Sequence, residues 1–134
     1  MSEENVEAVR RIYAEWERGN LAAALDLFDP EIVFESFMPD SSERIVARGP
    51  QEIKAFTRDF LVQTREYRMI GEDFREVAGD KVFVAGRQAT IGRRSGVSVD
   101  GPAFWIWTFR GDKVVRLLFE TRKRNALAAA GLSE

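Results

Sequence analysis

The sequence predicts an α+β domain in which helices cover one face of a curved antiparallel sheet. Three observations indicate this class. Helical periodicity dominates the first half of the chain, and the period-two alternation of strands dominates from Tyr67 onward. A tight turn at Gly111-Asp112 then joins the two most apolar strands. With 134 residues the chain suits a single domain, residues 1–134, long enough to bury about two-thirds of its unfolded surface.

The first half of the chain contains helix signals around one short strand. Apolar residues recur at helical spacing in the first of these helices: Val6, Val9, Ile12, Tyr13 and Trp16. Asn20 suits the cap of a second helix, and Asp29-Pro30 ends it. We expect, in order, a helix from Ser2 to Gly19, a helix at residues 21–28, a strand at 31–37, a loop at 38–48 and a third helix opening at Gly49-Pro50.

The second half of the chain predicts an antiparallel meander of four strands. The expected strands are residues 67–77, 81–91, 97–109 and 114–121, followed by a last helix at 125–130. Gly101-Pro102 interrupts the third strand, which suggests a bulge or bend there.

A regular hairpin at Gly111-Asp112 would place Arg110 opposite Lys113 and Trp107 opposite Arg116. Side chains alternate across a sheet, so Phe104, Ile106, Thr108, Val115, Leu117 and Phe119 would share one face, and Trp105, Trp107, Phe109, Val114 and Leu118 the other. Both faces are apolar, and the three helices can cover only one of them. We therefore predict a homodimer through the face that carries Trp105 and Trp107; the alternative is partial cover by the C-terminal segment.

The composition excludes several kinds of chemistry. The chain has no Cys and no His, which removes disulfides, thiolate nucleophiles, imidazole catalysis and the usual thiolate or imidazole metal ligands. We expect no metal and no cofactor. A formal charge of -2, with basic and acidic residues interspersed, predicts neither a nucleic-acid nor a membrane partner. The acidic N-terminus lacks the apolar core of a signal peptide, so the expectation is a cytoplasmic protein.

A series of short motifs runs almost from end to end of the chain. The motifs are Glu4-Asn-Val-Glu-Ala-Val-Arg-Arg-Ile-Tyr13 with Trp16, Gly19-Asn20-Leu21, Leu27-Phe-Asp-Pro-Glu-Ile-Val33, Arg48-Gly-Pro50, Ser95-Gly96-Val97, Trp107-Thr-Phe-Arg110, Lys113-Val-Val-Arg116 and Ala126-Leu-Ala-Ala-Ala-Gly-Leu-Ser-Glu134. In this order they resemble the SnoaL-like proteins of the nuclear transport factor 2-like superfamily, which includes ketosteroid isomerase, limonene epoxide hydrolase and polyketide cyclases. The resemblance implies a cone-shaped fold with a pocket between the helices and the sheet, and dimers through the other sheet face.

The resemblance also implies site positions, and most of them have changed here. Tyr13 matches the tyrosine of ketosteroid isomerase, but Ser36 and Phe104 stand where that enzyme carries acids. Arg87 matches the arginine of limonene epoxide hydrolase, whose two acids correspond to Ala89 and about Phe119. The polyketide cyclases carry an acid near the end of the last strand, and the only acid in the corresponding stretch, Phe119 to Arg122, is Glu120. A regular hairpin turns Glu120 away from the pocket, and only a bulge would reverse that.

The sequence is compatible with two classes of function. The first is a SnoaL-like domain that binds a small hydrophobic or polycyclic molecule in an apolar pocket lined by Tyr13, Trp16, Phe34, Ser36, Phe56, Phe60, Phe83, Arg87, Phe104, Ile106 and Phe119. The second is a cofactor-independent isomerase, cyclase or hydrolase that uses Tyr13 and Arg87 to polarise an oxygen, with Glu35 or Glu120 as the proton acceptor.

Each candidate also has a purely structural reading. Tyr13 suits a buried core aromatic, and Arg87 suits a salt bridge with Glu35 or Glu120 or exposure at a strand end. Glu35 and Ser36 must face opposite sides of the sheet, and we favour Ser36 on the pocket side.

Overall fold

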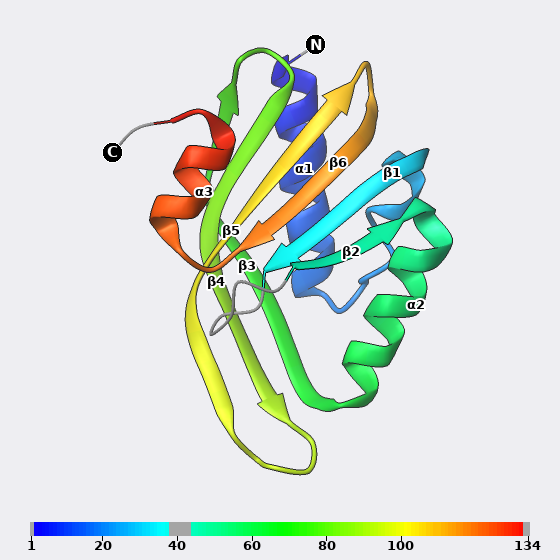
Figure 1. The fold of residues 1–134 in the computed structure, drawn as a ribbon, viewed down its shortest axis with the longest axis vertical. Coiled ribbons are helices and arrows are strands. Elements are labelled where there is room, and N and C mark those ends of the chain that lie inside the picture. Colours follow the sequence, from blue (N-terminus) through cyan, green and yellow to red (C-terminus); the bar gives the residue numbers. More distant parts are fainter. Residues whose placement is uncertain (1, 38–43, 133–134) are drawn as a thin grey trace.

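Six strands form one curved, mixed sheet in the computed structural model, which describes residues 2–37 and 44–132 (Figure 1). The strands are β1 (Phe28–Phe37), β2 (Arg44–Arg48), β3 (Thr64–Val77), β4 (Lys81–Gly92), β5 (Ser98–Arg110) and β6 (Lys113–Glu120). They lie in the order β2-β1-β6-β5-β4-β3, with β1 and β6 parallel and the other neighbours antiparallel. The predicted α+β class and the four-stranded meander are both confirmed.

Within the described ranges three α-helices accompany the sheet: α1 (Ser2–Glu17), α2 (Gly49–Val62) and α3 (Lys123–Ala130). The helix expected at residues 21–28 is shorter than predicted, a 3-10 turn η1 (Leu25–Leu27). Phe28 already pairs with Val114 as the first residue of β1, so too few residues remain for a stable α-helix. The predicted loop at residues 38–48 contains β2, and its residues 38–43 lie outside the described part of the chain.

The turn between β5 and β6 forms as predicted, with Arg110 opposite Lys113, but the register beyond it differs. Thr108 lies opposite Arg116 and Trp107 opposite Leu117, because Val115 is an extra residue in β6. Such a bulge reverses the facing of every residue that follows it on its strand. Leu117 and Phe119 therefore share a face with Trp105 and Trp107, and the face assignment made from a regular hairpin is wrong for β6.

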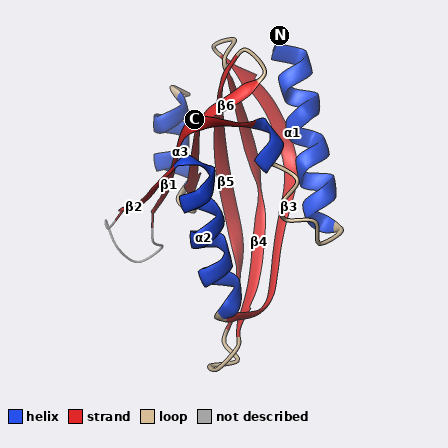
Figure 2. Cartoon of the chain, turned by 90° about the vertical axis from the view of Figure 1, so that its right-hand side faces the viewer, coloured by secondary structure: helices blue, strands red, loops and turns tan. Residues whose placement is uncertain are grey.

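Helices cover both faces of the sheet, and Figure 2 shows α1 and α3 on opposite sides of it. We call the side of α1 and α2 the inner face and the side of α3 the outer face. Trp105 and Trp107 lie on the inner face and are 2% and 0% exposed within the single chain. The prediction that this face is open to a partner subunit is therefore wrong, and self-association itself stays a prediction.

The alternative prediction was that the C-terminal segment covers the face of Trp105 and Trp107. This segment does cover the sheet, but on the outer face. The apolar residues of α3 pack there on strand residues in a second buried cluster of Phe83, Phe104, Ile106, Leu118, Ala126, Leu127 and Ala130. Three of these, Phe83, Phe104 and Ile106, were expected in the pocket, and the sheet separates them from Tyr13.

β3 and β4 approach closely at Gly86, which lies opposite Gly71 beside an irregularity in β3. A Cβ atom on Gly86 would stand 1.9 Å from the carbonyl oxygen of Ile70, whereas one on Gly101 would meet nothing within 4 Å. We predict that Gly86→Ala lowers the free energy of unfolding by about 2 kcal/mol or more, as backbone overpacking does. Gly101→Ala is the matched control. Urea denaturation measures both, and equal stability of the two variants would contradict the close approach.

Candidate functional site

Tyr13 of α1 is the centre of an aromatic group on the inner face. Its ring makes edge-to-face contacts with Trp16, Trp105, Phe74 and Trp107, at centroid distances of 4.7, 5.1, 5.4 and 6.0 Å. Gly71 leaves room for this ring, since a Cβ there would come within 3.1 Å of it. This packing is worth about 0.5–1.5 kcal/mol for each aromatic pair beyond the buried area. The helical spacing that places Tyr13 on the buried side of α1 therefore positions its hydroxyl as well.

The hydroxyl of Tyr13 accepts a hydrogen bond from Nε1 of Trp107 at 3.2 Å. Burial raises the pKa of Tyr13 well above its ordinary value, so the phenol stays neutral and keeps its own proton. A second donor lies nearby, because Nε1 of Trp16 is buried and has no hydrogen-bond partner in the described part of the chain. The inner face thus offers uncharged hydrogen-bond donors within apolar surroundings.

A second group of aromatic side chains lies on the inner face beside α2. The rings of Phe34 and Phe56 are 5.6 Å apart, and those of Phe60 and Tyr67 are 4.8 Å apart. The ring of Phe119 lies 5.4 Å from that of Trp105 and so joins this group to the one around Tyr13. We call Phe34, Phe56, Phe60, Tyr67 and Phe119 the α2-side group. All five are only half-buried, whereas Tyr13, Trp105 and Trp107 are buried.

Tyr67 was not among the predicted site residues. It lies on the inner face because it pairs with Thr90 two positions from the Met69–Gln88 pair. Burial raises its pKa above the ordinary value, so it too stays neutral. The signal that could have found it is the alternation Tyr67, Met69, Gly71 at the start of the predicted strand. Ser36, which we expected to face inward, does so, since it pairs with Phe119.

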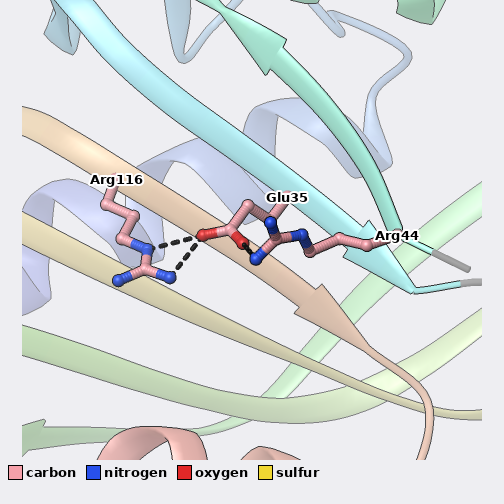
Figure 3. Close-up of polar contacts among 3 residues, drawn as sticks. All are labelled: Glu35, Arg44 and Arg116. Atoms are coloured by element: carbon pink, nitrogen blue, oxygen red, sulfur yellow. Dashed lines mark hydrogen bonds and ion pairs between the residues drawn. The ribbon is translucent and has the colours of Figure 1, made fainter. Parts of the chain in front are cut away.

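Glu35 lies on the outer face, where it is held by two arginines (Figure 3). Arg116 of β6 donates from Nε at 2.8 Å and from Nη2 to Oε1, and Arg44 of β2 donates from Nη1 to Oε2 at 2.8 Å. The carboxylate side chain is 6% exposed, while both arginine side chains are more than half exposed. Both oxygens of Glu35 are therefore engaged, and neither is directed toward Tyr13.

Glu120 is the other buried carboxylate, with a side chain that is 4% exposed. The bulge at Val115 reverses the direction in which Glu120 would point in a regular hairpin. Glu120 therefore shares a face with its partner Phe104, and that face is the outer one, away from Tyr13. Its Oε1 accepts from the backbone N–H groups of Thr121 and Arg122 and from Nε of Arg122, each at 3.0 Å. Glu120 thus fixes the chain where it enters α3.

Arg87 also lies on the outer face, on the same side of β4 as Phe83. Its Nη2 donates to Oδ1 of Asp100 at 2.6 Å, and both side chains are about half exposed. This is a surface ion pair with a partner that the sequence did not suggest. The four predicted catalytic residues are therefore not brought together: Tyr13 is on the inner face, and Arg87, Glu35 and Glu120 are on the outer face.

Two surface hollows among the described residues lie away from the α2-side group. One is between α1 and the Ala23–Leu27 stretch, and the other is at the far end of β3, β4 and β5. Among residues 2–37 and 44–132, no group of three or more Asp or Glu residues could hold a metal ion. No helix in these same ranges is long and apolar enough to cross a membrane.

Comparison with known proteins agrees with this architecture. The SnoaL-like domain family matches residues 9–117. No curated protein sequence matches the chain significantly. An NTF2-like protein from Burkholderia thailandensis is 23% identical, with a TM-score of 0.77 over 96% of this chain and 98% of that one. A protein assigned as a SnoaL-like polyketide cyclase from Jannaschia is 20% identical, with a TM-score of 0.74 over 99% and 95%. TerC, crystallised with polyporic acid, is 20% identical, with a TM-score of 0.73 over 94% and 96%.

The bond between Trp107 and Tyr13 predicts an unequal response to loss of the two tyrosine hydroxyls. Tyr13→Phe leaves the buried indole N–H of Trp107 without a partner, so we expect a loss of about 1–3 kcal/mol in the free energy of unfolding. Tyr67→Phe removes a hydroxyl that does not bond to an indole and is expected to cost less. A double-mutant cycle with Trp107→Phe isolates the pair, and zero coupling energy would refute the bond.

The raised pKa values of Tyr13 and Tyr67 predict a loss of stability at alkaline pH. The folded state favours the neutral phenols, so their contribution is fully present below the ordinary tyrosine pKa of about 10 and is lost as pH rises above it. Denaturant unfolding at pH values from about 9 to 12 measures the slope. The double variant Tyr13→Phe/Tyr67→Phe should show a shallower decline, and an unchanged slope would contradict burial of neutral phenols.

Proposed function

This chain belongs to the SnoaL-like domain family, and we propose that it binds a small, mostly apolar molecule on the inner face of the sheet, beside α2. The ligand would contact the α2-side group and would reach toward Tyr13. The proposal is for binding, with an uncharged ligand that carries at least one hydrogen-bond acceptor. It rests first on the unequal burial of the inner-face aromatic side chains.

The unequal burial is the observation that carries the proposal. Tyr13, Trp105 and Trp107 are closed off from solvent, but the α2-side group stays half-buried although it occupies the same face, as do Trp16 and Phe74 beside Tyr13. Large apolar side chains that stay partly exposed within a concave face are typical of small-molecule sites. A ligand that covered one phenyl ring fully would gain about 1.5–3 kcal/mol from that contact.

The polar groups of the same region indicate the kind of ligand. Tyr13 and Tyr67 are neutral phenols, and Trp16 has an indole N–H without a partner in the described residues. Each can donate a hydrogen bond, and none brings a charge. Such groups suit a carbonyl or hydroxyl oxygen on an otherwise apolar, aromatic molecule better than an ionised one.

Two of the similar structures point in the same direction. TerC was crystallised with polyporic acid, and the Jannaschia protein is assigned as a polyketide cyclase. At 20% identity this likeness concerns the fold, so these descriptions support only the class of ligand proposed here. They do not extend to a reaction, because this chain has its buried carboxylates on the other side of the sheet.

The proposal predicts that neutral polycyclic carbonyl compounds bind. With 9,10-anthraquinone as the probe, we expect quenching of tryptophan fluorescence and amide shifts in β1, β6 and α2 by nuclear magnetic resonance. Phe56→Leu should weaken binding about tenfold, because it removes an aromatic contact of the α2-side group.

Phe37→Leu is the matched control, since Phe37 is also half-buried but packs on the outer-face cluster. Its affinity for the probe should equal that of the natural chain. Native mass spectrometry of protein purified from its own cells would report a retained molecule and the number of subunits together. Equal weakening by Phe56→Leu and Phe37→Leu, or no binding of the probe and no retained molecule, would refute the proposal.

A further inference from the structure

A row of polar side chains crosses the outer face, on the opposite side of the sheet from the proposed ligand. Arg116 of β6 lies opposite Thr108 of β5, and Thr108 lies opposite Lys81 of β4. Cross-strand partners of this kind share a face and lie side by side. Each of the three stands two residues along its strand from a residue that α3 covers: Leu118, Ile106 and Phe83. The polar row therefore lies directly beside the apolar cluster that α3 covers.

Arg116 is oriented within this row by Glu35. A guanidinium has two edges that can bind an oxyanion with paired N–H groups, one with Nε and Nη2 and the other with Nη1 and Nη2. Glu35 takes the Nε and Nη2 edge. Figure 3 shows Nη1 directed away from Glu35, so the second edge points away from the carboxylate. The buried acid thus fixes a long side chain that would otherwise lose rotamer entropy on binding.

Thr108 and Lys81 complete the row with a hydroxyl donor and an ammonium. Neighbouring strands lie about 4.8 Å apart, so the backbones of Arg116 and Lys81, on either side of Thr108, are about 10 Å from each other. Long side chains from both ends can therefore reach one group above Thr108. Lys81 Nζ lies 3.3 Å from Oδ1 of the adjacent turn residue Asp80. A contact of this exposed kind is worth little and yields easily to a ligand.

The local charge balance favours an anion. Arg116 and Arg44 share the single carboxylate of Glu35, so this three-residue cluster carries a net positive charge although the whole chain has a formal charge of -2. An ion pair buried on a sheet is weak evidence for stability, because apolar residues of similar volume often do as well. The exposed guanidinium groups of Arg116 and Arg44 are better explained by an anion that they can bind.

We propose that Arg116, Thr108 and Lys81 form a binding site for an oxyanion, the phosphate or carboxylate group of a small molecule, on the outer face of the sheet. Arg116 would donate from its Nη1 and Nη2 edge, Thr108 from its hydroxyl and Lys81 from its ammonium group. The site does not depend on the ligand proposed for the inner face, and either can fail without the other.

The test is a titration of the labelled natural chain with inorganic phosphate at constant ionic strength, followed by amide shifts in nuclear magnetic resonance spectra. We expect saturable shifts at Lys81, Thr108 and Arg116. A parallel titration with acetate distinguishes a phosphate site from a carboxylate site. Shifts that do not saturate, or that spread over exposed basic residues throughout the chain, would overturn the proposal.

Single substitutions separate the three contributions. Thr108→Val removes only the hydroxyl and should weaken binding about threefold. Lys81→Met should weaken it about fivefold, in the range of one charge-assisted hydrogen bond. Arg116→Lys keeps the charge but loses the fork and should weaken binding about tenfold. Lys54→Met, at an exposed position of α2, is the control and should change nothing.

The first two variants leave both ion pairs of Glu35 intact, so they test the site even where Arg116→Lys perturbs folding. Unchanged phosphate and acetate affinity in both Thr108→Val and Lys81→Met would refute the assignment. The same holds if Lys54→Met weakens binding as much as Lys81→Met, because the effect would then be general screening.

Discussion

One extra residue in β6 decides which side chains meet in this protein. Val115 interrupts the pairing of β5 with β6, and from Arg116 onward every side chain of β6 faces the other way. Leu117 and Phe119 therefore join Trp105 and Trp107 under α1 and α2, and Glu120 joins Phe104 under α3. The parallel neighbour β1 follows this register, so Ser36 faces inward and Glu35 outward. Both buried carboxylates owe their location to this bulge.

The sheet consequently separates two chemical environments. The inner face holds neutral donors among aromatic rings, with the phenol of Tyr13 kept protonated by burial. The outer face holds the charged groups Glu35, Glu120 and Arg87, each already paired with an opposite charge. In general acid–base catalysis each acid or base must lie within hydrogen-bond reach of the substrate atom with which it exchanges a proton. Because the sheet stands between Tyr13 and the carboxylates, binding fits this chain better than the acid–base chemistry of catalytic relatives.

Local signals in the sequence were sufficient for much of the fold. The spacing of apolar residues around Tyr13 predicts α1, and Gly111 predicts the turn, where its φ of 64° suits glycine. The bulge at Val115 could not be predicted, because both faces of the hairpin are apolar and either register buries hydrophobic residues. The short strand β2 was missed for a related reason: Ile45-Val46-Ala47 between two arginines is too brief a pattern to distinguish from a loop. The missed bulge also led to errors in the predicted site. Phe83, Phe104 and Ile106 were expected in the pocket but lie on the outer face, whereas Tyr13, Ser36 and Phe34 lie on the inner face as predicted.

The two buried carboxylates are better understood as positioning groups than as reactive ones. Burying an ionised carboxyl costs several kcal/mol unless charge and hydrogen bonds compensate it. Glu120 receives two backbone N–H groups and one guanidinium on the same oxygen, and this fixes the direction in which the chain enters α3. Glu35 receives two guanidinium groups, and this fixes Arg116 beside Thr108. In both cases the acid is neutralised by its partners, and what it determines is the placement of a neighbouring element or side chain. Glu120 thus positions helix α3, and Glu35 positions Arg116 in the polar row, although a sequence motif would assign both acids to catalysis.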